Sequence, residues 1–516
     1  MGTYLGIDIG TSGTKTIAID EKGEILASAS AEYPCSVPRP LWSEQDPEEW
    51  WKAVVKTVHS VLDQIGEHGP EVRAIGLSGQ MHGSVFLDEK DRVLRPAILW
   101  NDQRTGEECR QIEEMAGGRE NLIQMAANPA LTGFTAPKIL WLRNHEPENF
   151  DKMKKVLLPK DEIRRRLTGE YATDVSDASG MLLLDIRKRN WSKKLLSLLD
   201  LDESLLGKVY ESEEITGQLT QEAADLLGLS SRCLVVGGAG DCAAGAVGNG
   251  IVRPGILSTS IGTSGVMFVH SDEVKIDPLG RVHTFCHAVR NKWHLMGVNL
   301  SSGGSLQWFK NSLCPELLRE AREKSAEIYD LLAEEAEKTP PGAEGLFFLP
   351  YLSGERTPLA DPDARGAFIG LTLAHHRGHL VRALMEGVIY SMRESLEIFR
   401  SENIPVNEIR VSGGGSKSPL WRQMQADIFA QDVHRINSEE GPALGVALLA
   451  AVGTGEFTSI EEACAAAISL RDTISPQSEN SDFYNRAFPV YQNFYHQLKD
   501  SFQKIKNFNL ERLISD

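Results

Sequence analysis

The chain has 516 residues, of which 41% are hydrophobic and 24% charged, with 46 glycines and 23 prolines. This composition excludes collagen-like, disordered and coiled-coil proteins, and the length predicts two large domains or three small ones. The 54 lysines and arginines stand against 72 aspartates and glutamates. The net charge of −18 argues against extended nucleic-acid binding, although one locally neutralised pocket can still take a small anion.

The N-terminal segment predicts a meander of three short strands at 4–9, 16–20 and 24–28, separated by turn residues. Asp46 and Pro47 then supply an N-cap and a first-turn proline for a helix over 48–65, whose apolar residues recur at helical spacing. A strand follows at 72–77. Strands and helices alternate from there on, which indicates an α/β fold.

A second opening resembles the first. Residues 255–261, the loop Gly262–Gly265 and residues 266–270 again read as strand, Gly-Thr-Ser-Gly loop and strand. We therefore expect two related domains, 1–250 and 251–516, the second ending in a helical tail from about residue 456. Within the second, we expect a helix at 379–401, a strand at 408–411 and a helix that begins at Ser418-Pro419.

Seven cysteines form no Cys-x-x-Cys pair, and neither cysteines nor histidines have zinc spacing, which indicates a reducing compartment. No signal peptide is visible, and the longest apolar run, 443–452, is too short to span a bilayer. We expect a cytoplasmic protein with no membrane or nucleic-acid partner.

Three glycine-rich loops expose backbone N–H groups that suit phosphate oxygens: 10–13, 262–265 and 413–415. The hydroxyls of Thr11, Ser12 and Thr263 add donors. Each loop alone is equally well explained as a tight turn, but two nearly identical loops opening two halves favour phosphate binding.

Two common nucleotide-binding motifs fit poorly. Thr14 stands where a Walker A loop needs its second glycine, and a strand follows where a helix is needed. Residues 234–243 fit the dinucleotide pattern G-x-G-x-x-A. However, Asp241 would meet the pyrophosphate, and no acidic residue for the ribose follows at 255–265.

Two aspartates beside these loops suit phosphoryl-transfer chemistry, although each taken alone is more simply an N-cap or hairpin residue. Asp8 lies on the first strand next to its loop, where a carboxylate can hold Mg²⁺. Asp241 follows a strand within a run of small residues that lets a substrate approach, so it suits a general base.

Two further segments read as binding loops. Residues 78–83 end a strand with Gln80, Met81 and His82 between glycines, although a lone histidine is more often structural. Trp100 stands among polar residues and can stack on a sugar face or fill a core.

Taken together, these motifs resemble the FGGY carbohydrate kinases from Tyr4 to about residue 455. The matching stretches are 8–13, 41–47, 78–83, 97–102, 133–141, 158–161, 260–265, 351–358 and 441–445, with a near match at 366–386. Residues 80–83 and 99–102 favour the members that phosphorylate D-xylulose over those that act on glycerol, ribulose or gluconate.

The resemblance implies two ribonuclease-H-like domains of the actin/hexokinase ATPase type with a cleft between them, binding sugar and Mg-ATP, and a possible homodimer. Asp241 would accept the proton of the 5-hydroxyl of D-xylulose, and Asp8 would act on Mg²⁺. The residues implied in sugar binding are Gln80, Met81, His82, Trp100, Asp241 and Cys242. Those implied in nucleotide binding are Thr11, Ser12, Gly262, Thr263, Gly414, Gly415 and Ser416.

One departure and several alternatives remain. Cys242 stands where related kinases commonly have asparagine after the base, and a thiol is a weaker hydrogen-bonding group than an amide. Within the family, the alternative is a kinase for ribulose or another polyol. Outside it, the alternatives are a chaperone-type ATPase, which needs a further peptide-binding domain, a filament protein and, less well supported, a dehydrogenase.

Overall fold

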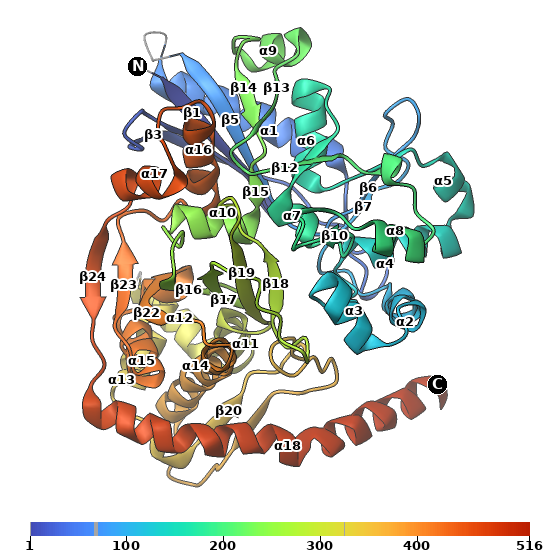
Figure 1. Ribbon diagram of the computed structural model, residues 1–516. Helices are drawn as coiled ribbons and strands as arrows, with labels where there is room; N and C mark the ends of the chain where they lie inside the picture. The colour runs from blue at the N-terminus through green and yellow to red at the C-terminus, as the bar shows by residue number, and fades with distance from the viewer. Residues whose placement is uncertain (1, 67–70, 325, 516) are drawn as a thin grey trace. The chain divides into compact units, whose positions relative to one another are not determined.

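The computed structural model describes residues 2–66, 71–324 and 326–515 (Figure 1). The chain forms two compact units, each assembled from separate segments. The first comprises Met1–Arg253, His270–His294 and Glu440–Ser469, and the second comprises Pro254–Val269, Leu295–Glu439 and Leu470–Asp516. Each unit has a central β-sheet with helices packed against it, so the predicted α/β class is confirmed.

The sheet of the first unit has the strand order β13-β14-β5-β1-β2-β3, and β15 pairs with the end of β5. Its strands are β1 (Thr3–Ile9), β2 (Gly13–Ile19), β3 (Ile25–Glu32), β5 (Val72–Gly79), β13 (Ile215–Gln218), β14 (Leu234–Val236) and β15 (Ala239–Gly240). The first three form the predicted antiparallel meander, whereas β5 runs parallel to β1. A strand, β2, follows the first glycine loop, as the argument against a Walker A loop expected.

Short strand pairs and helices complete the first unit. The pairs are β4 (Glu44–Gln45) with β7 (Ala97–Ile98), β6 (Val85–Leu87) with β8 (Lys155–Leu157), β9 (Ala172–Asp174) with β12 (Lys208–Tyr210), and β10 (Leu184–Asp185) with β11 (Asn190–Trp191); β18 (His283–Cys286) also lies in this unit. The helices are α1 (Pro47–Ile65), α2 (Gly106–Met115), α3 (Arg119–Ala126), α4 (Thr135–His145), α5 (Pro147–Lys152), α6 (Pro159–Thr168), α7 (Val175–Ser179), α8 (Lys193–Leu198), α9 (Gln221–Leu227), α10 (Asp241–Gly248), α16 (Gly441–Gly453) and α17 (Ile460–Ala467).

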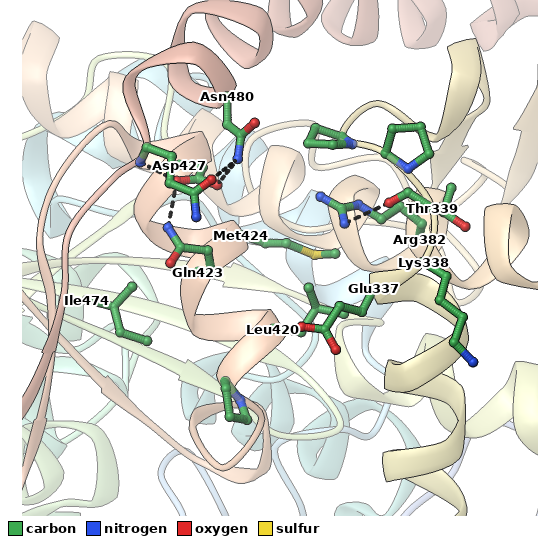
Figure 2. A pocket seen from close by; sticks show the side chains of 14 residues that line it. Glu337, Lys338, Thr339, Arg382, Leu420, Gln423, Met424, Asp427, Ile474 and Asn480 are labelled. Carbon is green, nitrogen blue, oxygen red and sulfur yellow. Dashed lines mark hydrogen bonds between the residues drawn. The ribbon is translucent and has the colours of Figure 1, made fainter.

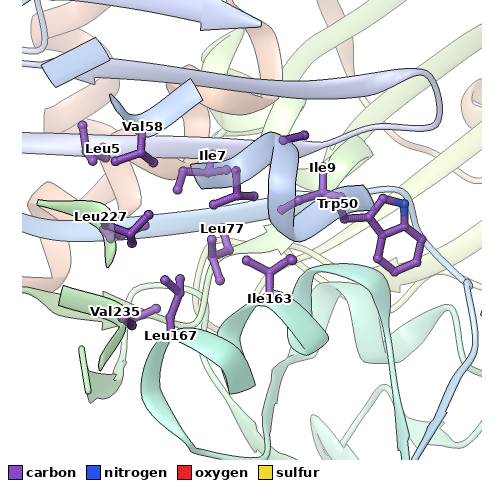
Figure 3. Packing of buried hydrophobic residues seen from close by; sticks show 14 of the residues in the cluster. Leu5, Ile7, Ile9, Trp50, Val58, Leu77, Ile163, Leu167, Leu227 and Val235 are labelled. Carbon is purple, nitrogen blue, oxygen red and sulfur yellow. The ribbon is translucent and has the colours of Figure 1, made fainter. Parts of the chain in front are cut away.

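The predicted helix over 48–65 is α1, and it begins as its sequence indicates. The Asp46 carboxylate accepts a hydrogen bond from the backbone N–H of Glu48 at 3.0 Å, and Pro47 occupies the first turn. Because side chains alternate across a strand, β1 presents Leu5, Ile7 and Ile9 to one face of the sheet. Figure 3 shows these residues packed with side chains of α1 and α6 in one buried cluster. Helices α10 and α16 contribute to a second cluster with Tyr4 of the same strand.

The sheet of the second unit contains, in this order, β19 (Trp293–Asn299), β17 (Gly265–Ser271), β16 (Gly255–Ile261), β22 (Val406–Ser412), β23 (Val433–Ile436) and β24 (Leu470–Ile474). β20 (Phe347–Leu349) pairs with β21 (Ala367–Ile369). The helices are α11 (Gly303–Leu313), α12 (Pro315–Lys324), α13 (Ile328–Glu337), α14 (Arg377–Ser401), α15 (Pro419–Phe429) and α18 (Ser478–Ser515). The helix predicted at 379–401 is α14, and the strand predicted at 408–411 is the centre of β22.

A cavity of about 570 Å³ in the second unit lies among α13, α14, α15 and the start of α18 (Figure 2). Its polar side chains bond to neighbouring groups of the protein. The Arg382 guanidinium donates to the Thr339 carbonyl and the Tyr484 hydroxyl, and the Asp427 carboxylate accepts from Asn480 at 2.9 Å. These bonds join α18 to α14 and α15.

Among the described residues, none of the helices combines the length and the apolar character that crossing a membrane requires.

Candidate active site

The two aspartates singled out from the sequence, Asp8 and Asp241, lie at the ends of neighbouring elements of the first unit. Asp8 pairs with Ser78 between β1 and β5, and Ser78 pairs with Ala239 between β5 and β15. Asp241 follows two residues after Ala239, as the first residue of α10. Three adjacent strands therefore bring both carboxylates to one edge of the sheet.

Both carboxyl groups have perturbed acidity. Burial and, next, the negative charge of Asp241 raise the pKa of Asp8 to about 7, against the opposing influence of Ser78 and Lys15. Burial likewise raises the pKa of Asp241, whose Oδ1 accepts a hydrogen bond from the Cys242 backbone at 2.7 Å. Oδ1 of Asp8 is buried and has no hydrogen-bond partner within the described part of the chain. That oxygen can therefore serve a ligand.

Sequence reasoning missed the cations around these aspartates. Lys15 lies directly opposite Asp8 between β1 and β2, and its ammonium pairs with Glu440 at 2.5 Å. Its place on the strand after the loop was a usable signal, since residues facing each other in a hairpin project to the same side of the sheet.

A fully buried ion cluster lies nearby and was also missed. The Lys160 ammonium contacts Asp161 at 2.6 Å, Asp174 at 3.0 Å and Asp177 at 3.4 Å. Although burial disfavours its charge, these carboxylates raise the pKa of Lys160. Burial raises the pKa of Asp177, and the negative charge of Asp241 adds to that effect. The cluster therefore borders the predicted base. Two of its residues, Lys160 and Asp161, lie in the stretch 158–161 that resembles the family.

The loop after β5 holds the predicted sugar-binding residues in fixed positions. The Gln80 amide donates to the Gln45 side chain at 2.8 Å, and the Gln80 backbone N–H donates to the Ile9 carbonyl. Met81 is buried against Gly240, where a Cβ atom would lie 2.9 Å from Cγ of Met81. The residue before Asp241 must therefore stay small for Met81 to lie there.

Trp100 and Thr11 meet in the structure. The indole Nε1 of Trp100 donates to the Thr11 hydroxyl at 2.9 Å, and the Thr11 carbonyl accepts from Gln45 at 2.7 Å. Ser12, the next residue, is exposed. Trp100 is only half-buried and has its polar atom directed at the first glycine loop, so it does more than fill the core.

In the second unit, the two remaining glycine loops follow adjacent parallel strands. Ser260 at the end of β16 pairs with Ser412 at the end of β22, which places the loops 262–265 and 413–415 side by side. A cavity of about 720 Å³ opens beside them, a size suited to a small-molecule ligand. Its lining includes Gly262, Thr263, Gly303, Leu306, Gln307, Tyr329, Asp330, Met385, Gly414, Gly415, Lys417, Ser418 and Trp421.

Four predicted nucleotide residues, Gly262, Thr263, Gly414 and Gly415, thus line one cavity. Ser416 is instead buried, and its hydroxyl donates to the Gly413 carbonyl at 2.8 Å, so it stabilises the loop from within. The sequence analysis did not identify Tyr329, Asp330 and Met385 as cavity residues, because they lie on α13 and α14, outside the glycine-rich loops.

Two family models match the chain: the N-terminal domain of the FGGY family of carbohydrate kinases over residues 3–248, and its C-terminal domain over residues 257–454. The chain belongs to this family. It is 40% identical to xylulose kinase of Bacillus subtilis (strain 168) over 508 residues. The aligned region covers 98% of this chain and 99% of the relative. The crystal structure of xylulose kinase from Rhodospirillum rubrum matches with a TM-score of 0.89 and 30% identity, over 97% and 100% of the two chains. Gluconokinase of Bacillus licheniformis is 31% identical over 506 residues, 98% of each chain.

Membership in the FGGY family confirms the predicted actin/hexokinase-like fold and makes the protein a carbohydrate kinase whose phosphoryl donor is ATP. It decides against the dehydrogenase, chaperone and filament alternatives. The kinase therefore needs a site for an acceptor hydroxyl and a site for a nucleotide.

Proposed function

We propose that this FGGY kinase transfers the γ-phosphoryl group of ATP to the 5-hydroxyl of D-xylulose, with Asp241 as proton acceptor. The observation that carries the proposal is the placement of Asp241 at the start of α10, half-buried, directly after the glycine against which Met81 packs, and within electrostatic reach of Asp8. The similarity to xylulose kinases over nearly the whole chain supports D-xylulose as the acceptor.

In this reaction the substrate 5-hydroxyl oxygen forms a bond to the γ-phosphorus while the bond from that phosphorus to the ADP oxygen breaks. The hydroxyl proton passes to the carboxylate of Asp241. Because the transition state of phosphoryl transfer is loose, positioning and charge neutralisation supply most of the rate enhancement.

The acceptor sugar is assigned to residues of the predicted domain 1–250, and the nucleotide mainly to residues of 251–516. Gln80, Met81, His82, Trp100 and Cys242 would contact the sugar. Gly262, Thr263, Gly414 and Gly415 would lie along the nucleotide, with Ser416 holding their loop, and Thr11 and Ser12 would add phosphate donors. The size and lining of the cavity in the second unit support the nucleotide assignment.

The residues present fit a magnesium ion bound chiefly through phosphate oxygens and water. Asp8 offers one buried carboxylate oxygen without a hydrogen-bond partner among the described residues. Within that same part of the chain, no three His, Cys, Asp or Glu side chains converge to hold a metal alone. This agrees with the reluctance of Mg²⁺ to lose its water. When bound, the ion would neutralise phosphate charge, and Asp8 would hold it.

The test is ADP release with Mg-ATP and D-xylulose, D-ribulose, L-ribulose, glycerol, gluconate or no sugar. A strong preference for D-xylulose over a low sugar-free rate is expected. Preference for another acceptor would move the assignment to the alternative, a kinase for another ketose or polyol, which the similarity to gluconokinase keeps open.

The role of Asp241 has its own test. Asp241→Asn should lower kcat by several orders of magnitude and leave the KM for ATP nearly unchanged. Asp202→Asn, which alters an exposed cap, is the matched control and should retain full activity. Near-normal turnover of Asp241→Asn would refute the assignment of Asp241 as proton acceptor.

Family resemblance further suggests a homodimer, which sedimentation equilibrium would check.

A further inference from the structure

His82 has a backbone conformation that its neighbours must hold in place. Its φ angle is 68°, in the left-handed region that residues with a side chain seldom adopt. The ring is packed against Phe134 at 4.7 Å between centroids, and Nδ1 lies 2.8 Å from the Gly180 carbonyl oxygen. A Cβ atom on Gly180 would come within 2.4 Å of the ring, so that glycine fixes how far the ring can move.

The carbonyl of His82 accepts two side-chain hydrogen bonds from α4. Nζ of Lys138 donates to it at 2.8 Å, and the Thr135 hydroxyl donates at 3.1 Å. Lys138 also donates to the Gly133 carbonyl at 2.7 Å, just before the same helix begins. One side chain therefore joins the start of α4 to the turn that carries His82.

This use of Lys138 is costly for the fold. The side chain is completely buried, and burial holds the pKa of Lys138 well below its usual range. Lys138 forms no ion pair with a carboxylate in the part of the chain that the structure describes. A backbone carbonyl could be satisfied by water or by a neutral donor, so burying an amine here calls for a function beyond satisfying a hydrogen bond.

We propose that Lys138, assisted by Thr135, is a positioning residue that fixes His82 for recognition of the acceptor sugar. The inference rests on the proposed function, because His82 is there assigned to the sugar. Nδ1 faces the Gly180 carbonyl oxygen, so Nδ1 carries a proton and this hydrogen bond holds the ring in one orientation toward the proposed sugar site. Lys138 acts by holding the backbone from which that ring projects.

The test is a double-mutant cycle on the KM for the acceptor, using Lys138→Met and His82→Ala. Lys138→Met alone should raise this KM about tenfold to a hundredfold, the effect expected for losing two buried hydrogen bonds, and leave the KM for ATP unchanged. In the His82→Ala background, Lys138→Met should raise the acceptor KM no further. Effects that simply multiply would overturn the inference, and so would an unchanged acceptor KM in folded Lys138→Met.

Thr135→Val serves if Lys138→Met fails to fold, since it removes only one hydroxyl donor and should raise the acceptor KM about twofold to tenfold. Thr57→Val is the matched control, because it removes a buried hydroxyl from α1 in the same unit and should lower stability without changing either KM. If Thr135→Val leaves the acceptor KM unchanged, the inference is refuted.

The cycle uses whichever acceptor the wild-type enzyme prefers, so failure of the D-xylulose assignment leaves this test intact. If His82→Ala does not alter the acceptor KM, the inference fails while the phosphorylation itself stands.

Discussion

Gly6 on β1 lies against Ala443 on α16 so closely that a Cβ atom at Gly6 would come within 1.9 Å of the Ala443 carbonyl oxygen. Gly76 on β5 has the same relationship to Val446, one turn further along the helix. The absence of two side chains therefore lets a helix from near residue 440 pack directly on the strands that carry Asp8 and Ser78.

Gly6→Ala should destabilise the protein by about 3 kcal/mol, because backbone rather than a flexible side chain must move. Chemical unfolding followed by circular dichroism would measure the loss. Gly106→Ala is the control: that glycine is in the first turn of α2 with open space around it, so the substitution should be nearly neutral. Equal stability of the two variants would contradict this account of the close packing.

Local signals were sufficient for much of the fold. The Asp46-Pro47 cap, the alternation in β1 and the spacing within α1 and α14 all act over a few residues, so the sequence displays them directly. The close approach of Gly6 to Ala443 joins positions more than 400 residues apart. A single sequence carries no local sign of such a contact, so the return of α16 to the first unit could not be predicted.

The candidate site was predictable to a similar degree. Asp8 could be proposed because it lies on the first strand beside its glycine loop, and Asp241 because it follows a strand within a run of small residues. Lys138 and Lys160 were not, because a lysine is expected at the surface and only tertiary structure supplies the carbonyls and carboxylates that keep it inside. Tyr329 lines the cavity proposed for the nucleotide, but it comes from a helix that no phosphate motif marks.

His294 and His287 should make the protein sensitive to acid. Burial, and next the neighbouring histidines, lower the pKa of His294 to about 3 and that of His287 well below its ordinary value. Between pH 6.5 and about 3, the His294 imidazole is therefore protonated in the unfolded chain but neutral in the native state. For His294 this costs up to about 1.4 kcal/mol of stability for each pH unit lost in that range, and His287 acts in the same direction.

The measurement is the free energy of unfolding of wild type and His294→Phe at pH values from 8 to 5. The variant loses packing and hydrogen bonding at every pH. It also lacks the group whose protonation favours the unfolded state, so the difference in free energy of unfolding between wild type and variant should shrink below pH 6.5. A disadvantage that stays constant across this range would contradict a neutral His294 in the native state.

Glu394 and Glu355 should have the opposite effect in the second unit. Burial, and next the charge of Glu355, raise the pKa of Glu394 to about 8, and burial raises that of Glu355 to about 7. The native state therefore holds protons that the unfolded chain has released above about pH 4.5. Stability from these groups falls as the pH rises towards 8.

Glu394→Gln, which resembles the protonated acid and cannot ionise, should be about as stable as wild type at pH 5.5 and more stable at pH 8.5. Guanidinium unfolding at the two pH values, with Glu397→Gln at a partly exposed position of the same helix as control, would measure the difference. A variant that is less stable than wild type at pH 8.5 would show that Glu394 is ionised in the native protein.

Cys242 should limit the affinity for the acceptor sugar. Burial, and next the adjacent charge of Asp241, raise the pKa of its thiol well above the ordinary value, so the group is an uncharged, weak hydrogen-bonding partner next to the proposed base. Cys242→Asn should lower the KM for the preferred ketose about threefold to tenfold, because an amide both donates and accepts strong hydrogen bonds. Steady-state kinetics with D-xylulose and D-ribulose would detect this change.

The control is Cys233→Ser, which alters a buried cysteine of the same unit that is not assigned to the proposed site. It should leave the KM values for both ketoses unchanged. If Cys242→Asn alters the KM for ATP but not that for either ketose, the side chain at this position does not contact the sugar.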